Sequence, residues 1–323
     1  MIEFLDGIRA SIHEAWLIPA LYDLGLMAWE EEAFDWLGFA LLGLVQIAVC
    51  IALCGGLEWW RPVERWKDSA AVRTDILYTL LIRLGILPLA VFVLFRPLQV
   101  WMHGTIVDFG MVPPTLESLL PPLRDYPLIA LAVYVVVLDF GEYWRHRLQH
   151  SIPWWWELHA VHHAQTQMTF WTDDRNHLVD DVIAAIWLGL LALAIGVPPA
   201  QFPVIVLVTR IVESLSHANA RVDFGAVGER LLVSPRFHRA HHGVLSTEAK
   251  GVNYGVLLPV WDWMFGTANW NRRDYPATGV PGADEAIVSG GFLAQQVAGL
   301  RAALARLRPG SARRGSRTRE QHE

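Results

Sequence analysis

Apolar residues are concentrated in four long runs along the chain. The clearest run covers residues 36–57, "WLGFALLGLVQIAVCIALCGGL", which is 22 positions without a charged side chain. A helix rises about 1.5 Å per residue, so this run is long enough to cross a hydrocarbon core about 30 Å thick. The pattern predicts a transmembrane helix here.

The other three runs are interrupted by polar or helix-breaking residues. Residues 76–100 contain Arg83 and Arg96, which a membrane tolerates where a long side chain reaches the interface. Residues 126–138 are apolar or small up to Asp139, so we expect this helix to continue past the membrane surface. Residues 182–208 are broken by "GVPPAQFP". Its prolines disfavour one straight helix and predict a hairpin that returns the chain to the same side.

Composition agrees with this pattern. The chain is 53% hydrophobic and 18% charged, against about 45–50% and about 25% in soluble domains. We therefore predict an all-α integral membrane protein with about four to five passes, including the hairpin. The net charge of −6 does not indicate a nucleic-acid partner. Cys50 and Cys54 lie in the first apolar run, four residues apart, and are interpreted as packing residues.

The distribution of basic residues predicts the orientation. Arg61, Arg65, Lys67 and Arg73 follow the first apolar run, and arginines recur after residue 300. The positive-inside rule places both segments in the cytoplasm. We expect a protein of the bacterial inner membrane whose remaining polar part forms a helical cap on the cytoplasmic side.

Histidines are the candidate chemistry of that cap. The chain has 13 of them, and the spacing His-x-x-His-His occurs twice, in "LHAVHHA" at 158–164 and "FHRAHHG" at 237–243. Residues three or four apart share a helix face, and neutral imidazole is the commonest metal ligand. The candidate metal ligands are His146, His150, His159, His162, His163, His177, His217, His238, His241 and His242.

This number of imidazoles exceeds what one ion needs. A tetrahedral zinc site uses three or four ligands, so the surplus predicts two metal ions a few ångströms apart. Ligand type alone leaves zinc, iron, copper and nickel open. The ring nitrogen that does not bind metal needs an acceptor. Candidate acceptors are Asp139, Glu142, Glu157, Asp173, Asp174, Asp180, Asp181 and Glu213.

Six segments in order make the chain resemble a known family. They are "DFGEYWRHRLQH", "WELHAVHHA", "RNH", "SHANARVDFG", "SPRFHRAHH" and "NYGVLLPVWDWMFGT", within residues 126–268. Together they resemble the fatty acid hydroxylase and sterol desaturase superfamily of membrane diiron oxygenases. The resemblance implies two iron ions, replaceable by zinc in purified protein, and O₂. It also implies a lipid substrate from the bilayer that is hydroxylated or desaturated.

The resemblance extends to individual residues and to the division of the chain. All ten histidines above match the family's ligand positions, and Asp139, Glu157 and Asn219 are expected to support them. Residues 1–35 would form an amphipathic extracytoplasmic segment, and 36–125 the first two transmembrane helices with their loops. Residues 126–270 would form the catalytic domain, and 271–323 a basic, partly disordered cytoplasmic tail.

Two other functions remain open from the sequence. A zinc-dependent membrane hydrolase would place a glutamate beside paired histidines, as in His-Glu-x-x-His, and neither repeat has one. A catalytically silent lipid-binding protein would keep the fold alone. An oxygenase would also need a separate electron donor, a ferredoxin or a cytochrome with its reductase, because the chain has no nucleotide or iron–sulfur motif.

Overall fold

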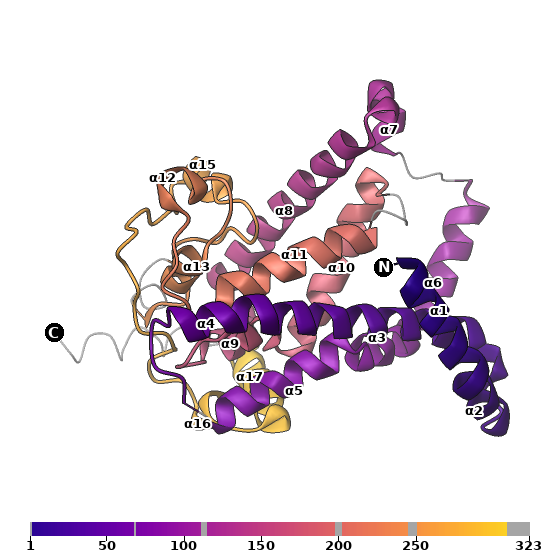
Figure 1. Ribbon diagram of the computed structural model, residues 1–323, viewed down its shortest axis with the longest axis horizontal. Helices are drawn as coiled ribbons and strands as arrows, with labels where there is room; N and C mark the ends of the chain where they lie inside the picture. Colours follow the sequence, from indigo (N-terminus) through magenta and orange to yellow (C-terminus); the bar gives the residue numbers. More distant parts are fainter. Residues whose placement is uncertain (1, 68, 111–114, 198–201, 245–250, 309–323) are drawn as a thin grey trace. The chain divides into compact units, whose positions relative to one another are not determined.

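The computed structural model describes residues 2–67, 69–110, 115–197, 202–244 and 251–308 (Figure 1). Over these residues the chain is helical, without a strand; two isolated bridges pair Pro62 with Ala220 and Gly243 with Thr278. The predicted all-α class is therefore confirmed. The chain divides into two compact units, Met1–Ala52 with Thr79–Met111, and Leu53–Tyr78 with Val112–Glu323.

The first unit contains no candidate ligand. Its elements are α1 (Ile2–Ile12), η1 (His13–Leu17), α2 (Ile18–Asp23), η2 (Met27–Trp29), α3 (Glu30–Cys50), the end of α5 (Ala70–Arg83) and α6 (Ile86–Asp108). A close approach of backbones holds it together at Gly43. A Cβ there would lie 1.8 Å from the carbonyl oxygen of Arg83, so only glycine lets α3 and α5 meet at this point.

The second unit carries every predicted ligand. After η3 (Ile51–Gly55) its elements are α4 (Gly56–Trp60), α7 (Leu116–Leu119), η4 (Pro121–Asp125), α8 (Pro127–Ser151), α9 (Pro153–His163), η5 (Phe170–Asp174), α10 (Leu178–Ile195), α11 (Phe202–His217), α12 (Gly225–Gly228), α13 (Pro235–His241), α15 (Val260–Phe265), α16 (Glu285–Val288) and α17 (Phe292–Leu307).

Helices α8, α10 and α11 form the apolar body of this unit (Figure 1). Their core contains Ala130, Tyr134, Leu138 and Ile205, with residues of α10 packed around them. Gly141 lets α8 and α10 approach each other closely, because a Cβ at this position would lie 2.3 Å from the Leu191 side chain. The three helices position the histidines that lie at their ends.

Helices long and apolar enough to cross a membrane coincide with the predicted runs. They are Met27–Trp60, Pro127–Ser151 and Leu178–Ile195, and the pair Ala70–Arg83 and Ile86–Pro97, bent by 49°, would make a fourth span. The described part of the chain therefore contains three candidate membrane spans, or four. Helix α11, the second arm of the predicted hairpin, has 16 residues and is not one of them. Part of the predicted break, 198–201, lies outside the described residues.

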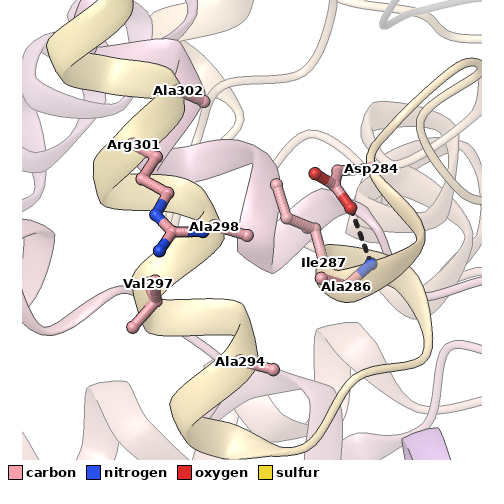
Figure 2. A pocket seen from close by; sticks show the side chains of 8 residues that line it. All are labelled: Asp284, Ala286, Ile287, Ala294, Val297, Ala298, Arg301 and Ala302. Carbon is pink, nitrogen blue, oxygen red and sulfur yellow. Dashed lines mark hydrogen bonds between the residues drawn. The ribbon is translucent and has the colours of Figure 1, made fainter.

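The C-terminal segment differs from the predicted tail. Helix α17 packs along α9, where Ala303 joins Trp155 and Leu158 in one buried cluster. A hollow of about 420 Å³ lies between α16 and α17, lined by alanines, Ile287 and Val297 with Asp284 and Arg301 (Figure 2). The Asp284 carboxylate accepts a hydrogen bond from the Ala286 amide and caps α16. The remainder of the predicted tail, 309–323, lies outside the described residues.

Candidate metal centre

Nine of the ten predicted ligands lie in two compact groups. Within each group, one ligand nitrogen from every histidine lies within 4.8 Å of the others. All nine side chains are buried except His150, which is partly exposed. Group A contains His146, His150, His159, His163 and His241, and group B contains His162, His217, His238 and His242.

Four helices supply these side chains. His146 and His150 lie one turn apart near the end of α8, and His217 is the last residue of α11. Helix α9 begins with Pro153 and ends with the pair His162 and His163. Helix α13 begins after Ser234, whose hydroxyl accepts a hydrogen bond from the Phe237 amide. This helix carries His238 and His241, and His242 is its C-cap.

Each His-x-x-His-His repeat contributes to both groups. In the first repeat, His163 belongs to group A and His162 to group B. In the second, His241 belongs to group A and His242 to group B. The groups adjoin, because the rings of His163 and His242 stack with their centroids 4.2 Å apart. The two sequence repeats therefore form opposite walls of one site.

Backbone carbonyls orient the rings. The Nδ1–H group of His146 donates to the Tyr254 carbonyl (2.9 Å), and that of His241 donates to the Val252 carbonyl (2.7 Å). In the same way, His162 donates to the Arg175 carbonyl (3.2 Å) and His217 to the Glu213 carbonyl (2.7 Å). A carbonyl only accepts, so each of these Nδ1 atoms carries the proton. The lone pair is then on Nε2, which faces the centre of the group. Metal-bound histidines typically donate an outer hydrogen bond of this kind from the other ring nitrogen.

These lone pairs require a positive charge between them. The Nε2 atoms of His217 and His162 are 3.1 Å apart, although both carry a lone pair. Burial, and then neighbouring imidazoles, hold the pKa of His162 well below its usual value. Burial also lowers the pKa of His241 to about 3. Protons therefore do not supply the charge at neutral pH, and a metal ion fits both groups.

Two ring nitrogens of group A have no other partner. His150 Nε2 and His159 Nε2 are buried, and within the described part of the chain neither makes a hydrogen bond. Buried polar atoms are normally satisfied, so orphaned atoms in one place indicate a missing ligand. The donors are all imidazole nitrogens, which suit iron, zinc, copper or nickel better than magnesium or calcium.

The residues predicted to support the ligands do something else. Asp139 accepts hydrogen bonds from the Leu257 and Leu258 amides and from Trp261, and so fixes the loop after α13. Glu157 pairs with Arg306 on α17. Asn219 exchanges hydrogen bonds with the backbone of Glu64. These three predictions were wrong in detail, because spacing along one helix does not identify the partners that another segment supplies.

His177 is the predicted ligand that neither group contains. Its Nδ1 accepts a hydrogen bond from the Val179 amide at the start of α10, and its Nε2–H donates to Gln296 O on α17 at 2.8 Å. Both ring nitrogens are thus used by the backbone, and no lone pair is left for a metal. His177 caps α10 and is not part of the proposed ligand set.

Three further buried residues, Asp180, Arg175 and Asp75, support the groups. Asp180 accepts hydrogen bonds from Gln149, from Trp155 and, at 3.3 Å, from His159. Arg175 forms a fully buried ion pair with Asp75 at 2.9 Å, and its own carbonyl accepts from His162. Asp180 was one of several candidate acceptors, and Arg175 lies in the quoted "RNH"; Asp75, about 100 residues away, had no sequence signal.

A cavity of about 210 Å³ leads to the histidines between α8, α10 and α11. His146, His159, His162, His217 and His238 form one end of it. The other end is apolar, with Val135, Leu138, Ala184, Leu188 and Ile205. A cavity of mixed lining that ends at a metal-binding cluster is the expected form of a small-molecule or lipid site.

Comparison with known proteins agrees with this geometry. Residues 131–267 match the family model described as fatty acid hydroxylase. The ornithine lipid hydroxylase OlsE of Rhizobium tropici is 34% identical over 163 residues, which is 50% of this chain and 47% of that protein. The alkylglycerol monooxygenase of Danio rerio is 32% identical over 130 residues, 40% of this chain and 28% of its own.

A plant relative shows the same similarity. Methylsterol monooxygenase 2-2 of Arabidopsis thaliana is 29% identical over 161 residues, 47% of this chain and 58% of its own. The chain therefore spans less than two thirds of the length of these relatives. No solved structure matches the chain.

Proposed function

We propose that this chain is a membrane diiron oxygenase of the fatty acid hydroxylase family and that it hydroxylates a lipid; the match of residues 131–267 to that family's model supports this proposal. The relatives are named as a hydroxylase and monooxygenases, which favours hydroxylation over desaturation. In the balanced reaction a C–H bond, O₂, two electrons and two protons give C–OH and water. The observation that carries the proposal is the pair of adjoining histidine groups at a cavity of mixed polar and apolar lining.

Two metal ions suit the nine imidazoles. Groups A and B would each hold one iron, with five and four candidate ligands. When bound, an iron pair supplies the change of oxidation state that O₂ reduction and C–H oxidation require, which zinc does not. Zinc could still replace iron in purified protein, because imidazole binds both.

The chain's own residues keep the site ready for that metal. Carbonyls of Tyr254, Val252, Arg175 and Glu213 fix which nitrogen of each ring is unprotonated. The Tyr254 carbonyl is itself held, since Asp262 accepts hydrogen bonds from the amides of Tyr254 and Gly255. The apolar end of the cavity would bind the lipid chain and exclude water from the reacting carbon.

The reaction would need an external electron donor. This donor would be a separate ferredoxin, or a cytochrome with its reductase. The substrate would come from the bilayer, and no nucleic acid is involved. The positive-inside rule supports a bacterial inner-membrane protein whose histidine groups face the cytoplasm, where such donors are found.

The site gives no support to a zinc hydrolase. Such an enzyme needs three or four ligands for one zinc ion, and the nine converging imidazoles exceed that number. A silent lipid-binding protein would have no use for two sets of converging lone pairs.

Labelled oxygen tests the proposal. Protein loaded with iron in detergent is mixed with the lipid extract of its host, a chemical reductant and ¹⁸O₂, and the lipids are analysed by mass spectrometry. We expect one ¹⁸O atom in a lipid product, absent with His163→Ala or His238→Ala and present with the matched control His13→Gln. Unlabelled product, or product that survives both substitutions, would contradict the proposal.

A further inference from the structure

The outer face of α8 changes from apolar to aromatic to basic along the helix. One stripe of this face carries Ile129, Val136, Phe140, Trp144 and Arg147, at intervals of three, four or seven residues. Ile129, Val136 and Phe140 are exposed, and the guanidinium of Arg147 lies over the Trp144 ring at 5.4 Å. A transmembrane helix that leaves a bilayer on the cytoplasmic side shows this order of side chains. Phe140 and Trp144 therefore mark the level of the interface on α8.

The short helix α15 packs on α8 at this level. The ring of Trp261 lies 4.8 Å from that of Phe140, and the ring of Phe265 lies 5.1 Å from that of Trp144. Trp261 and Phe265 are four residues apart, so they share the face of α15 that meets α8. The opposite side of α15 is then directed away from α8, beside the place where the apolar run of α8 ends.

That outer side of α15 is apolar and exposed. Trp263 is 66% exposed and Met264 is 57% exposed, whereas Asp262, the charged residue of this helix, is buried. Two such side chains offer about 400 Å² at most, which is about half of what each partner contributes to a stable protein complex. A bilayer interface sets no such minimum, and Trp is enriched there because its ring is apolar and its N–H is polar. The position beside the outer face of α8 and the small area both favour the bilayer as the partner of this surface.

Hydrogen bonds connect α15 to the metal ligands. The Asp262 carboxylate accepts hydrogen bonds from the amides of Tyr254 (2.8 Å) and Gly255 (2.6 Å), and the Tyr254 carbonyl accepts one from His146. His146 comes six residues after Phe140, which is about 9 Å along α8. The loop that orients His146 is therefore attached to a helix that packs at the interface level of α8.

We propose that α15 is an interfacial helix. Trp263 and Met264 insert among the lipid headgroups where α8 leaves the bilayer, and this contact steadies the loop that orients His146. The partner of the surface is the bilayer itself. This inference rests on the proposed function, in which α8 crosses the membrane. It adds a membrane-binding surface that sets the height of the metal groups above the lipid.

Fluorescence quenching in lipid nanodiscs tests the insertion. The full chain carries a bimane label at Met264→Cys, at Val136→Cys on the outer face of α8, or at Ser289→Cys, the exposed C-cap of α16. The lipids carry a nitroxide on the headgroup or deep in the acyl chain. We expect the headgroup nitroxide to quench the label at position 264 at least about twofold more than the label at position 289. The deep nitroxide should quench the label at position 136 most.

The three labels separate the failure of this inference from that of the proposed function. Equal quenching at positions 264 and 289, with strong quenching at position 136, overturns the inference and leaves the proposed oxygenase standing. If the label at position 136 is not quenched either, α8 does not cross the membrane, and the proposed function fails with the inference.

Hydrogen exchange tests the connection to the ligand loop. Trp263 is exposed, so Trp263→Glu adds a charge at the interface without leaving a cavity, and Trp263→Tyr keeps an aromatic ring with a polar end. In nanodiscs we expect the amides of Tyr254 and Gly255 to exchange at least about tenfold faster with Trp263→Glu than with Trp263→Tyr. The control Leu304→Glu, at an exposed position of α17, should not change their exchange. The same exchange rate in all three variants would overturn the proposed role of the bilayer in steadying this loop.

Discussion

His162 and His163 are consecutive residues, yet their imidazoles belong to different groups. Successive residues of a helix point about 100° apart, so a His-His pair directs two rings into neighbouring spaces. The same holds for His241 and His242. The repeated spacing thus explains how two short helices can hold two metal ions. Sequence spacing predicted the candidate ligands, whereas their division into groups depends on how α8, α9, α11 and α13 pack.

Asp180 is the residue whose substitution best tests the support of a ligand. Asp180→Asn would weaken its hydrogen bond with His159, and we expect iron affinity to fall about 10- to 100-fold. Competition with a chelator, followed by metal analysis, measures this. Glu157→Gln is the matched control, because Glu157 contacts Arg306 and no ligand. Equal iron affinity in both variants would contradict the role of Asp180.

Substitution of His177 is expected to leave metal binding unchanged, in contrast to substitution of Asp180. Asparagine also accepts a hydrogen bond at a helix N-cap, so His177→Asn should keep the start of α10 while removing the imidazole. We expect the iron content per chain to stay unchanged, because both ring nitrogens already bind backbone groups. Loss of about half the iron, measured by plasma mass spectrometry, would show that His177 is a ligand after all.

At the scale of elements, the apolar runs were predictable and the polar helices after them were not. Residues 36–57, 126–138 and 182–208 lie in or overlap helices because long apolar stretches have few alternatives in a membrane. The sequence did not predict helix α17, because its arginines and the Gly- and Ser-containing stretch after it are typical of a basic, partly disordered tail. Its burial depends on Gln295, Gln296 and Gly299, which have no pattern visible in sequence. The supporting contacts join distant segments, as Asp75 and Arg175 do.

Contact between α17 and α9 depends on a glycine. A Cβ at Gly299 would lie 2.9 Å from the His177 ring and 3.0 Å from the Val161 side chain. We expect Gly299→Val to lower the free energy of unfolding by about 1–3 kcal/mol, because it overpacks a close contact. Thermal unfolding in detergent measures this. Gly189→Ala on α10, where a Cβ meets nothing within 4 Å, should not destabilise the protein. Equal melting temperatures for both variants would contradict this packing.

At the scale of the whole molecule, the proposal requires all histidines on one side of the membrane. Leu119 lies before the α8 span, Ser151 is the last residue of that span, and Leu231 follows the hairpin. We expect an impermeant maleimide to label Leu119→Cys in intact spheroplasts, and Ser151→Cys and Leu231→Cys in inverted vesicles. Cys50 and Cys54 are buried and give little background. Labelling of positions 151 and 231 from opposite sides would contradict the arrangement.

Metal content tests the central claim most directly. The full chain is purified without oxygen from cells grown with ⁵⁷Fe and is examined by metal analysis and Mössbauer spectroscopy. The two histidine groups predict about two irons per chain in a coupled pair, and His163→Ala and His238→Ala should each lower that number. A single uncoupled iron, or a full complement of zinc in protein that still forms product, would contradict the account.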